Sequence, residues 1–176
     1  DASLTITIKK QLVAQEGFLF GATVENRSDV RINELQLPFI DLECACDENK
    51  SRDVFYHANG LGAVIRSPWD TIRRTSHTEY ITSDNHVVWN AMRYPGDAAM
   101  SWFGLQSGGK FLYMGRHADE LRVTVLSVGV SPRLENDRLM MAISHLPFAK
   151  KGESVTVSEC FVSLSDGDWK NGSDIY

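Results

Sequence analysis

Two apolar runs separated by a pair of glycines constrain the fold of this chain more than any other feature. The first run ends at Ser107, the second begins at Lys110, and Gly108 and Gly109 lie between them. Glycine adopts the positive φ angles that a tight turn needs, so the pattern predicts a β-hairpin. Large apolar side chains alternate onto both faces of the first strand, as Trp102 and Phe103 illustrate. We therefore expect this hairpin at the centre of an all-β domain, with a further layer on each face.

Other segments also alternate apolar and polar residues with the period of two that indicates half-buried strands. Leu4, Ile6 and Ile8 follow this pattern, and so do residues 18–24. Further strands are expected at residues 30–40, 63–65, 78–82, 86–89, 121–130, 138–146 and 153–164. Short polar links such as residues 26–29 favour an antiparallel arrangement. Roughly ten strands at this spacing predict a mostly antiparallel two-layer β-sandwich.

Helical signals are sparse by comparison. Residues 67–69 are interpreted as terminating the strand at residues 63–65, and residues 47–53 as a solvated loop. Only residues 168–176 are expected to start a helix, with Ser173 or Asp174 as an early capping residue.

Length and charge limit the classes of partner. The 176 residues fit one domain with a sizeable core. A formal net charge of −5 without a basic run argues against nucleic acid, because phosphate binding needs clustered Lys and Arg. No apolar run approaches the roughly 20 residues that cross a bilayer, so no membrane partner is predicted. Asp1 is not an initiator Met, so we expect either a removed targeting segment or a piece of a longer chain.

The cysteines predict neither a disulfide framework nor a metal site. Cys44 and Cys46 have the spacing of half a zinc site, but only Cys160 and scattered histidines are available to complete it. We expect reduced, mostly buried thiols, no metal and no cofactor.

A set of short motifs spans nearly the whole chain in a fixed order. They occupy residues 24–29, 32–38, 59–62, 67–69, 94–102, 112–119 and 167–176. Together they resemble the N-terminal β-sandwich of bacterial glycoside hydrolases, a domain of galactose mutarotase-like (supersandwich) type that precedes a catalytic (β/α)8 barrel. The resemblance implies a sandwich over residues 1–166 and an exit segment over residues 167–176, leading toward a catalytic domain that this sequence does not contain.

The same resemblance implies a non-catalytic role for this chain. In such hydrolases the acid and the nucleophile lie on the barrel, so no catalytic residue is assigned here. The expected partners are the barrel of the same parent chain and a carbohydrate ligand. A hydrolase pair within this chain would have to come from Asp97, Asp119, Glu120, Asp166 and Asp168. Asp166 and Asp168 flank a polar turn and Asp119-Glu120 follows a strand, where charged residues are explained by solvation.

Sugar rings stack on aromatic side chains, while polar groups bind their hydroxyls. The loop-rich middle of the chain supplies the candidate site: Trp69 and Trp89 as a platform, near Arg73 and His77. Trp102 is expected in the core, and Trp169 is expected to anchor the exit segment.

Two alternative functions remain open from the sequence. One is a stand-alone carbohydrate-binding module. The other is an aldose epimerase-like enzyme that uses a His and a carboxylate as general acid and base. Its candidates are His77, His86, His117 or His145 with Glu79 or Glu159.

Overall fold

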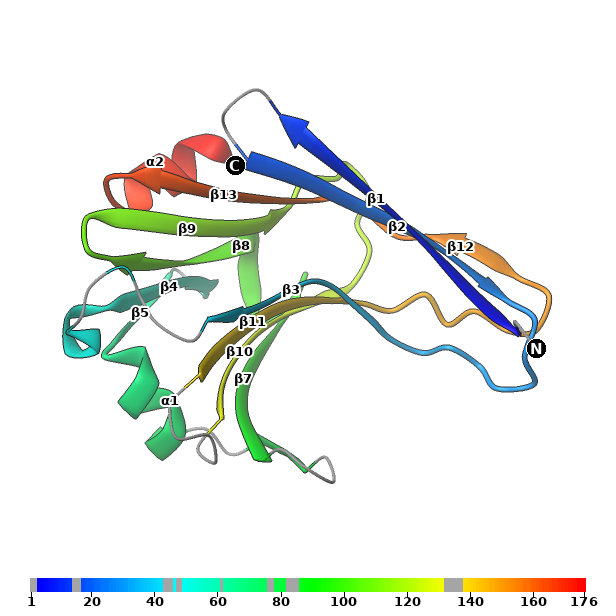
Figure 1. The fold of residues 1–176 in the computed structure, drawn as a ribbon, viewed down its shortest axis with the longest axis horizontal. Coiled ribbons are helices and arrows are strands. Elements are labelled where there is room, and N and C mark those ends of the chain that lie inside the picture. The colour runs from blue at the N-terminus through cyan, green and yellow to red at the C-terminus, as the bar shows by residue number, and fades with distance from the viewer. Residues whose placement is uncertain are drawn as a thin grey trace.

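The structure is a computed structural model that describes residues 3–13, 17–42, 46, 49–60, 62–75, 78–81, 86–131 and 138–176. For residues 75, 78–81, 86–89 and 131 it describes the backbone alone. The described strands form two antiparallel sheets that pack face to face (Figure 1). The prediction of an all-β, antiparallel two-layer sandwich is therefore confirmed.

The larger sheet has the strand order β1-β2-β13-β9-β8-β4-β5, and β12 also pairs with β2. In chain order its strands are β1 (Leu4–Val13), β2 (Gly17–Asn26), β4 (Val54–Asn59), β5 (Ala63–Arg66), β8 (Ala98–Ser107), β9 (Lys110–Arg116), β12 (Ser154–Thr156) and β13 (Cys160–Asp166). The smaller sheet has the order β3-β11-β10-β7-β6. Its strands are β3 (Leu35–Leu42), β6 (Thr78–Ile81), β7 (His86–Tyr94), β10 (Thr124–Ser131) and β11 (Arg138–His145).

The predicted hairpin is confirmed as β8 and β9. Ser107 pairs with Lys110, and the two glycines between them have φ angles of 55° and 74°. Positive φ at both central residues is what a type I′ turn requires. Phe103 points into the main core between the sheets, whereas Trp102 belongs to an aromatic cluster on the other face of the large sheet.

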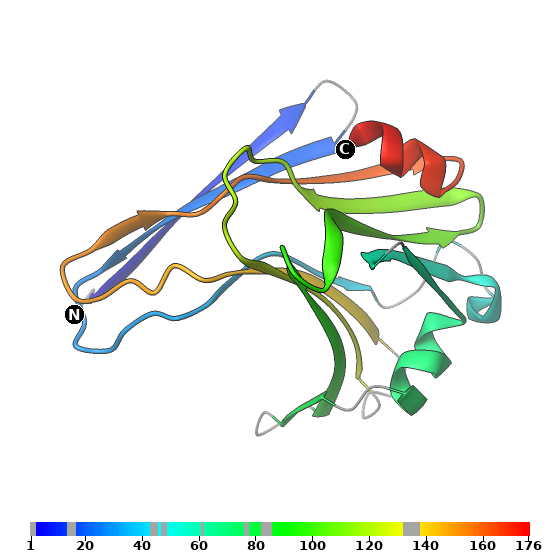
Figure 2. The same cartoon turned by 180° about the vertical axis from the view of Figure 1, so that it is seen from behind.

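Helix α2 (Trp169–Ile175) covers that other face, above β8 and β9 (Figure 2). Ile175 packs on the aromatic cluster, which consists of Trp102, Phe111, Tyr113 and Phe161. From Ser101 to Leu105, β8 is thus buried on both faces, by the smaller sheet on one side and by α2 on the other. This arrangement explains why large apolar side chains point to both faces of β8.

Both helices differ from the sequence prediction. Residues 67–69 follow the end of β5, as predicted, but they also begin a helix that the sequence did not predict: α1 spans Pro68–Thr75. Proline suits a first helical turn because its fixed φ is helical and that position needs no N–H bond. Helix α2 begins earlier than expected, at Trp169, because the Asp168 side chain accepts a hydrogen bond of 2.9 Å from the Lys170 N–H. A short 3-10 helix, η1 (Lys50–Arg52), lies in the predicted loop. None of the described helices is long and apolar enough to span a membrane.

Several strand boundaries also differ from the prediction. The strand expected at residues 30–40 begins only at Leu35, and the one expected at 153–164 is divided into β12 and β13.

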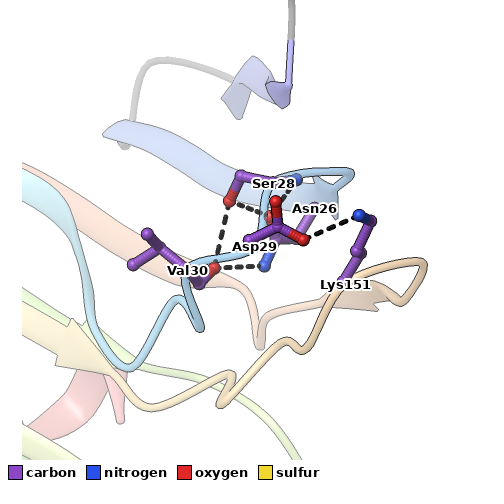
Figure 3. Close-up of polar contacts among 5 residues, drawn as sticks. All are labelled: Asn26, Ser28, Asp29, Val30 and Lys151. Atoms are coloured by element: carbon purple, nitrogen blue, oxygen red, sulfur yellow. Dashed lines mark hydrogen bonds and ion pairs between the residues drawn. The ribbon is translucent and has the colours of Figure 1, made fainter.

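The late start of β3 has a physical cause at Asn26, which is 1% exposed. Its amide donates to the Val30 carbonyl and accepts two hydrogen bonds from Ser28 (Figure 3). The same amide also donates to the Ala149 carbonyl. These bonds hold residues 26–30 in a turn, and between Asn26 and Leu35 only Ile32 makes a β-bridge, an isolated one with Ala149.

Strand β1 is more exposed than its half-buried pattern predicts. It lies at the edge of the large sheet, beyond β2, and every residue from Leu4 to Leu12 is exposed. The alternation correctly indicates a strand, but the apolar face of β1 has little of the described chain packed against it.

Candidate functional site

A pocket of about 270 Å³ opens on the outer face of the large sheet, next to α2. Aromatic and other apolar side chains dominate its lining. They are Tyr56 from β4, Val64 from β5, Met100 and Trp102 from β8, and Trp169 from α2. His57, Ala58, Gly62 and Ala63 complete the described lining.

The strand period places these rings on the outer face. In β4, Phe55 faces the main core, so the next residue, Tyr56, faces the opposite side. The Tyr56 ring stacks on Trp169, with ring centroids 6.1 Å apart and an interplanar angle of 27°. Trp102 stacks on Tyr113 at 5.9 Å, which fixes the indole against the floor of the sheet.

Polar groups in the pocket are few and uncharged. The Tyr56 hydroxyl donates to the Gln106 side chain over 3.0 Å, and burial raises the pKa of Tyr56, with Asp168 contributing and Arg66 opposing. His57 borders the pocket, but its imidazole lies beside Met92 and the Phe55 ring of the main core, and burial lowers its pKa, so it is neutral at pH 7. The indole N–H of Trp102, a residue 5% exposed, has no hydrogen-bond partner among the described residues. The described lining residues therefore suit a neutral ligand with an apolar face, and none of them is a carboxylate.

Of the site that the sequence predicted, the structure describes the side chains of Trp69 and Arg73. Trp69 lies on α1 and not in a loop; it is 2% exposed, and its indole donates to the Asp53 carboxylate over 2.7 Å. It therefore offers no open ring face. Trp89 lies on β7, where only its backbone is described, and it pairs with Thr78. Arg73 is exposed on α1, and His77 lies outside the described residues.

Two tryptophans that were assigned to other roles line the pocket instead. Trp102 is nearly buried, as the sequence predicted, yet one part of it borders the pocket. Trp169 is 39% exposed at the start of α2. The strand period could have placed Trp102 on the face opposite Phe103, but no local signal indicates that Tyr56 and Trp169 meet across more than a hundred residues.

A second, polar depression of about 480 Å³ lies at the end of β9. Its charged or titratable side chains are His117, Asp119, Glu120, Arg122 and Glu159. The His117 Nε2 atom is 2.7 Å from the Tyr113 hydroxyl, and burial lowers the pKa of His117 and raises that of Tyr113. Both groups are therefore neutral at pH 7, and one of them donates a hydrogen bond to the other.

A buried arginine holds the loop that lines this depression. Arg116 is 2% exposed, and its guanidinium donates to the carbonyls of Glu120 and Arg122. These bonds fix the loop that carries Asp119 and Glu120.

A histidine–cysteine pair, His145 and Cys160, is buried in the core. Cys160 Sγ lies 3.5 Å from His145 Nε2, which is also 2.8 Å from the Leu37 carbonyl. Burial raises the pKa of Cys160 to about 12, so the thiol stays protonated and unreactive. Cys46 is exposed, and Cys44 lies outside the described residues. No group of three or more His, Cys, Asp or Glu in the described part of the chain is arranged to hold a metal ion.

Most of the carboxylates weighed in the sequence analysis have structural partners. Asp97 pairs with Arg93 at 3.1 Å, Glu120 with Arg122, and Asp166 with Lys110. Asp168 caps α2.

The sequence matches no family model, and a search of curated proteins finds no match either.

Proposed function

We propose that this chain is a carbohydrate-binding β-sandwich module of galactose mutarotase-like type. In this proposal it is the non-catalytic N-terminal part of a glycoside hydrolase and supports the (β/α)8 barrel of the parent chain. The observation that carries the binding role is the aromatic pocket lined by Tyr56, Trp102 and Trp169.

The chemistry of the pocket fits a sugar ring. A pyranose has a face of C–H groups that packs on an aromatic ring, and Tyr56 and Trp169 offer stacked rings at the pocket wall. At about 270 Å³ the pocket is slightly smaller than the range of roughly 300–1,000 Å³ found for drug-sized ligands, which favours one ring over a long chain.

Support for the non-catalytic role comes from the carboxylates. Asp97, Glu120 and Asp166 are in ion pairs on the surface, and Asp168 holds the N-terminus of α2. The motif resemblance supports the barrel as partner. Sequencing the parent gene beyond Tyr176 tests that part: a barrel-encoding reading frame is expected, and an immediate stop codon would favour the stand-alone module.

Titration with a panel of neutral mono- and oligosaccharides tests the binding role. Indole fluorescence is a direct readout, since Trp102 and Trp169 line the pocket. Replacing Trp169 with Ala removes a ring contact of about 0.5–1.5 kcal/mol, so affinity is expected to fall about 2- to 10-fold. Leu121→Ala is the matched control, because Leu121 is exposed and does not line the pocket. Equal affinity of the two variants, or no signal at millimolar sugar, would contradict the proposal.

One observation favours a second candidate function, the aldose epimerase. His117 and Glu159, both among the residues weighed for that role, line the same polar depression. Opening a cyclic hemiacetal needs a general acid and a general base on one ligand. Polarimetry on fresh α-glucose or α-galactose tests this candidate: His117→Gln should abolish any enhancement, and a wild-type rate equal to that of buffer would dismiss it.

A further inference from the structure

Strand β1 presents an open edge of the large sheet. It pairs with β2 over its whole length, from Leu4 opposite Asn26 to Val13 opposite Gly17, and it has no second neighbour among the described strands. In Figure 1 the dark blue strand lies at the outer border of the sheet. A long open edge is a template for another strand, because its outward N–H and C=O groups can pair only with an extended chain or with water.

The register identifies which backbone groups point outward. The Ser3 carbonyl accepts a hydrogen bond from the Arg27 N–H, so the backbone of Ser3 faces β2. Successive residues of an antiparallel strand point these groups to alternate edges. The even-numbered residues therefore carry the free backbone groups; they are Leu4, Ile6, Ile8, Lys10 and Leu12.

The same residues carry the exposed apolar side chains of the strand. Ile8 is 57% exposed and Leu12 is 64% exposed. Lys10 does not obstruct this face, because its ammonium group folds back over the Phe18 ring at 4.0 Å. The even-numbered residues of β1 therefore combine backbone groups that no described strand pairs with and apolar side chains that are exposed.

We propose that β1 pairs antiparallel with β1 of a second copy, with a two-fold axis at Ile8. The sequence of the strand is complementary to itself in this register. Leu4 lies opposite Leu12 of the second copy, and Ile8 lies opposite its own counterpart. Lys10 lies opposite Ile6, and Lys9 lies opposite Thr7, so no lysine faces a lysine. With the axis at Lys9 instead, the two Lys9 side chains would be directly opposed and would repel.

Sedimentation velocity over a hundredfold range of protein concentration tests the dimer. The wild-type chain is expected to form dimers whose fraction rises with concentration. Ile8→Lys places two ammonium groups opposite each other at the axis and is expected to weaken dimerisation at least about tenfold. Leu164→Lys is the matched control: Leu164 is equally exposed, but its strand, β13, is paired with β2 and β9. A wild-type chain that stays monomeric, or two variants with equal effect, would overturn the proposal.

Disulfide trapping tests the register itself, in a background with Cys44 and Cys46 replaced by Ser. A hydrogen-bonded antiparallel pair has its Cα atoms about 5.5 Å apart, which a disulfide can span. Ile8→Cys is therefore expected to cross-link two copies under mild oxidation. Thr5→Cys should not, because Thr5 lies opposite Gln11 and is about 20 Å from its own counterpart. Cross-linking of Thr5→Cys as efficiently as Ile8→Cys would exclude this register.

Discussion

At the scale of single residues, the buried Asn26 is expected to contribute strongly to stability. Its buried side-chain amide donates to the Val30 and Ala149 carbonyls, and its oxygen accepts from Ser28. Asn26→Ala removes all four hydrogen bonds of this buried side chain and is expected to lower the free energy of unfolding by about 2–3 kcal/mol in urea titrations.

Lys151→Ala is the matched control for that measurement. The Lys151–Asp29 ion pair lies in the same region (Figure 3), with both side chains mostly exposed. Exposed pairs contribute about 0–1 kcal/mol, so this variant should stay near the wild type. Equal losses for the two variants would show that the Asn26 bonds do not stabilise the turn.

The sequence predicts the turn that the bonds between Asn26 and Ser28 stabilise, but it does not predict the bond from Asn26 to a distant residue. Asn, Ser and Asp at residues 26–29 indicate a turn, and the Asn26–Ser28 bonds confirm it. The bond to Ala149 joins residues 123 positions apart, and no local pattern encodes it. The Trp69–Asp53 hydrogen bond also joins distant positions, sixteen residues apart. No local pattern indicates this bond, so the sequence alone favours a loop platform at Trp69 although its side chain is buried.

At the scale of elements, Gly172 controls how closely α2 lies on the large sheet. A Cβ atom there would clash with Phe111, which is fully buried and in edge contact with Tyr56 and Trp102. Gly172→Ala gains about 1 kcal/mol of helix propensity but costs about 1–3 kcal/mol through overpacking. We expect a lower Tm and altered Trp169 fluorescence as α2 shifts. Lys170→Ala, at an exposed position of the same helix, should leave both unchanged; a raised Tm for Gly172→Ala would contradict the close packing.

Elements with a strong local signal were predicted correctly, and elements defined by packing were not. The Gly108-Gly109 turn needs positive φ, so β8 and β9 could be predicted with their turn. Helix α1 has only eight residues, and its main local sign is Pro68 at the first position. The pocket was not predicted, because β4, β5, β8 and α2 each supply part of its wall and only the tertiary fold brings them together.

For the whole molecule, the buried histidines predict how stability depends on pH. Burial lowers the pKa of His57, His117 and His145, and Arg116 lowers that of His145 further, against the opposing Leu37 carbonyl bond. The folded state therefore binds fewer protons than the unfolded state below the ordinary histidine pKa of about 6.5. The stabilisation is complete above that pH and is lost as the pH falls toward the folded-state values, by at most about 1.4 kcal/mol per pH unit for each histidine.

Urea titrations between about pH 7.5 and pH 5 measure this dependence, in a window above the range where ordinary carboxylates titrate. The midpoint is expected to fall steadily with pH. His145→Gln keeps an N–H donor for the Leu37 carbonyl but cannot titrate, so it should flatten the slope while retaining most of the stability at pH 7.5. A midpoint that rises on acidification, or a slope that His145→Gln leaves unchanged, would mean that this imidazole is not held neutral by the fold.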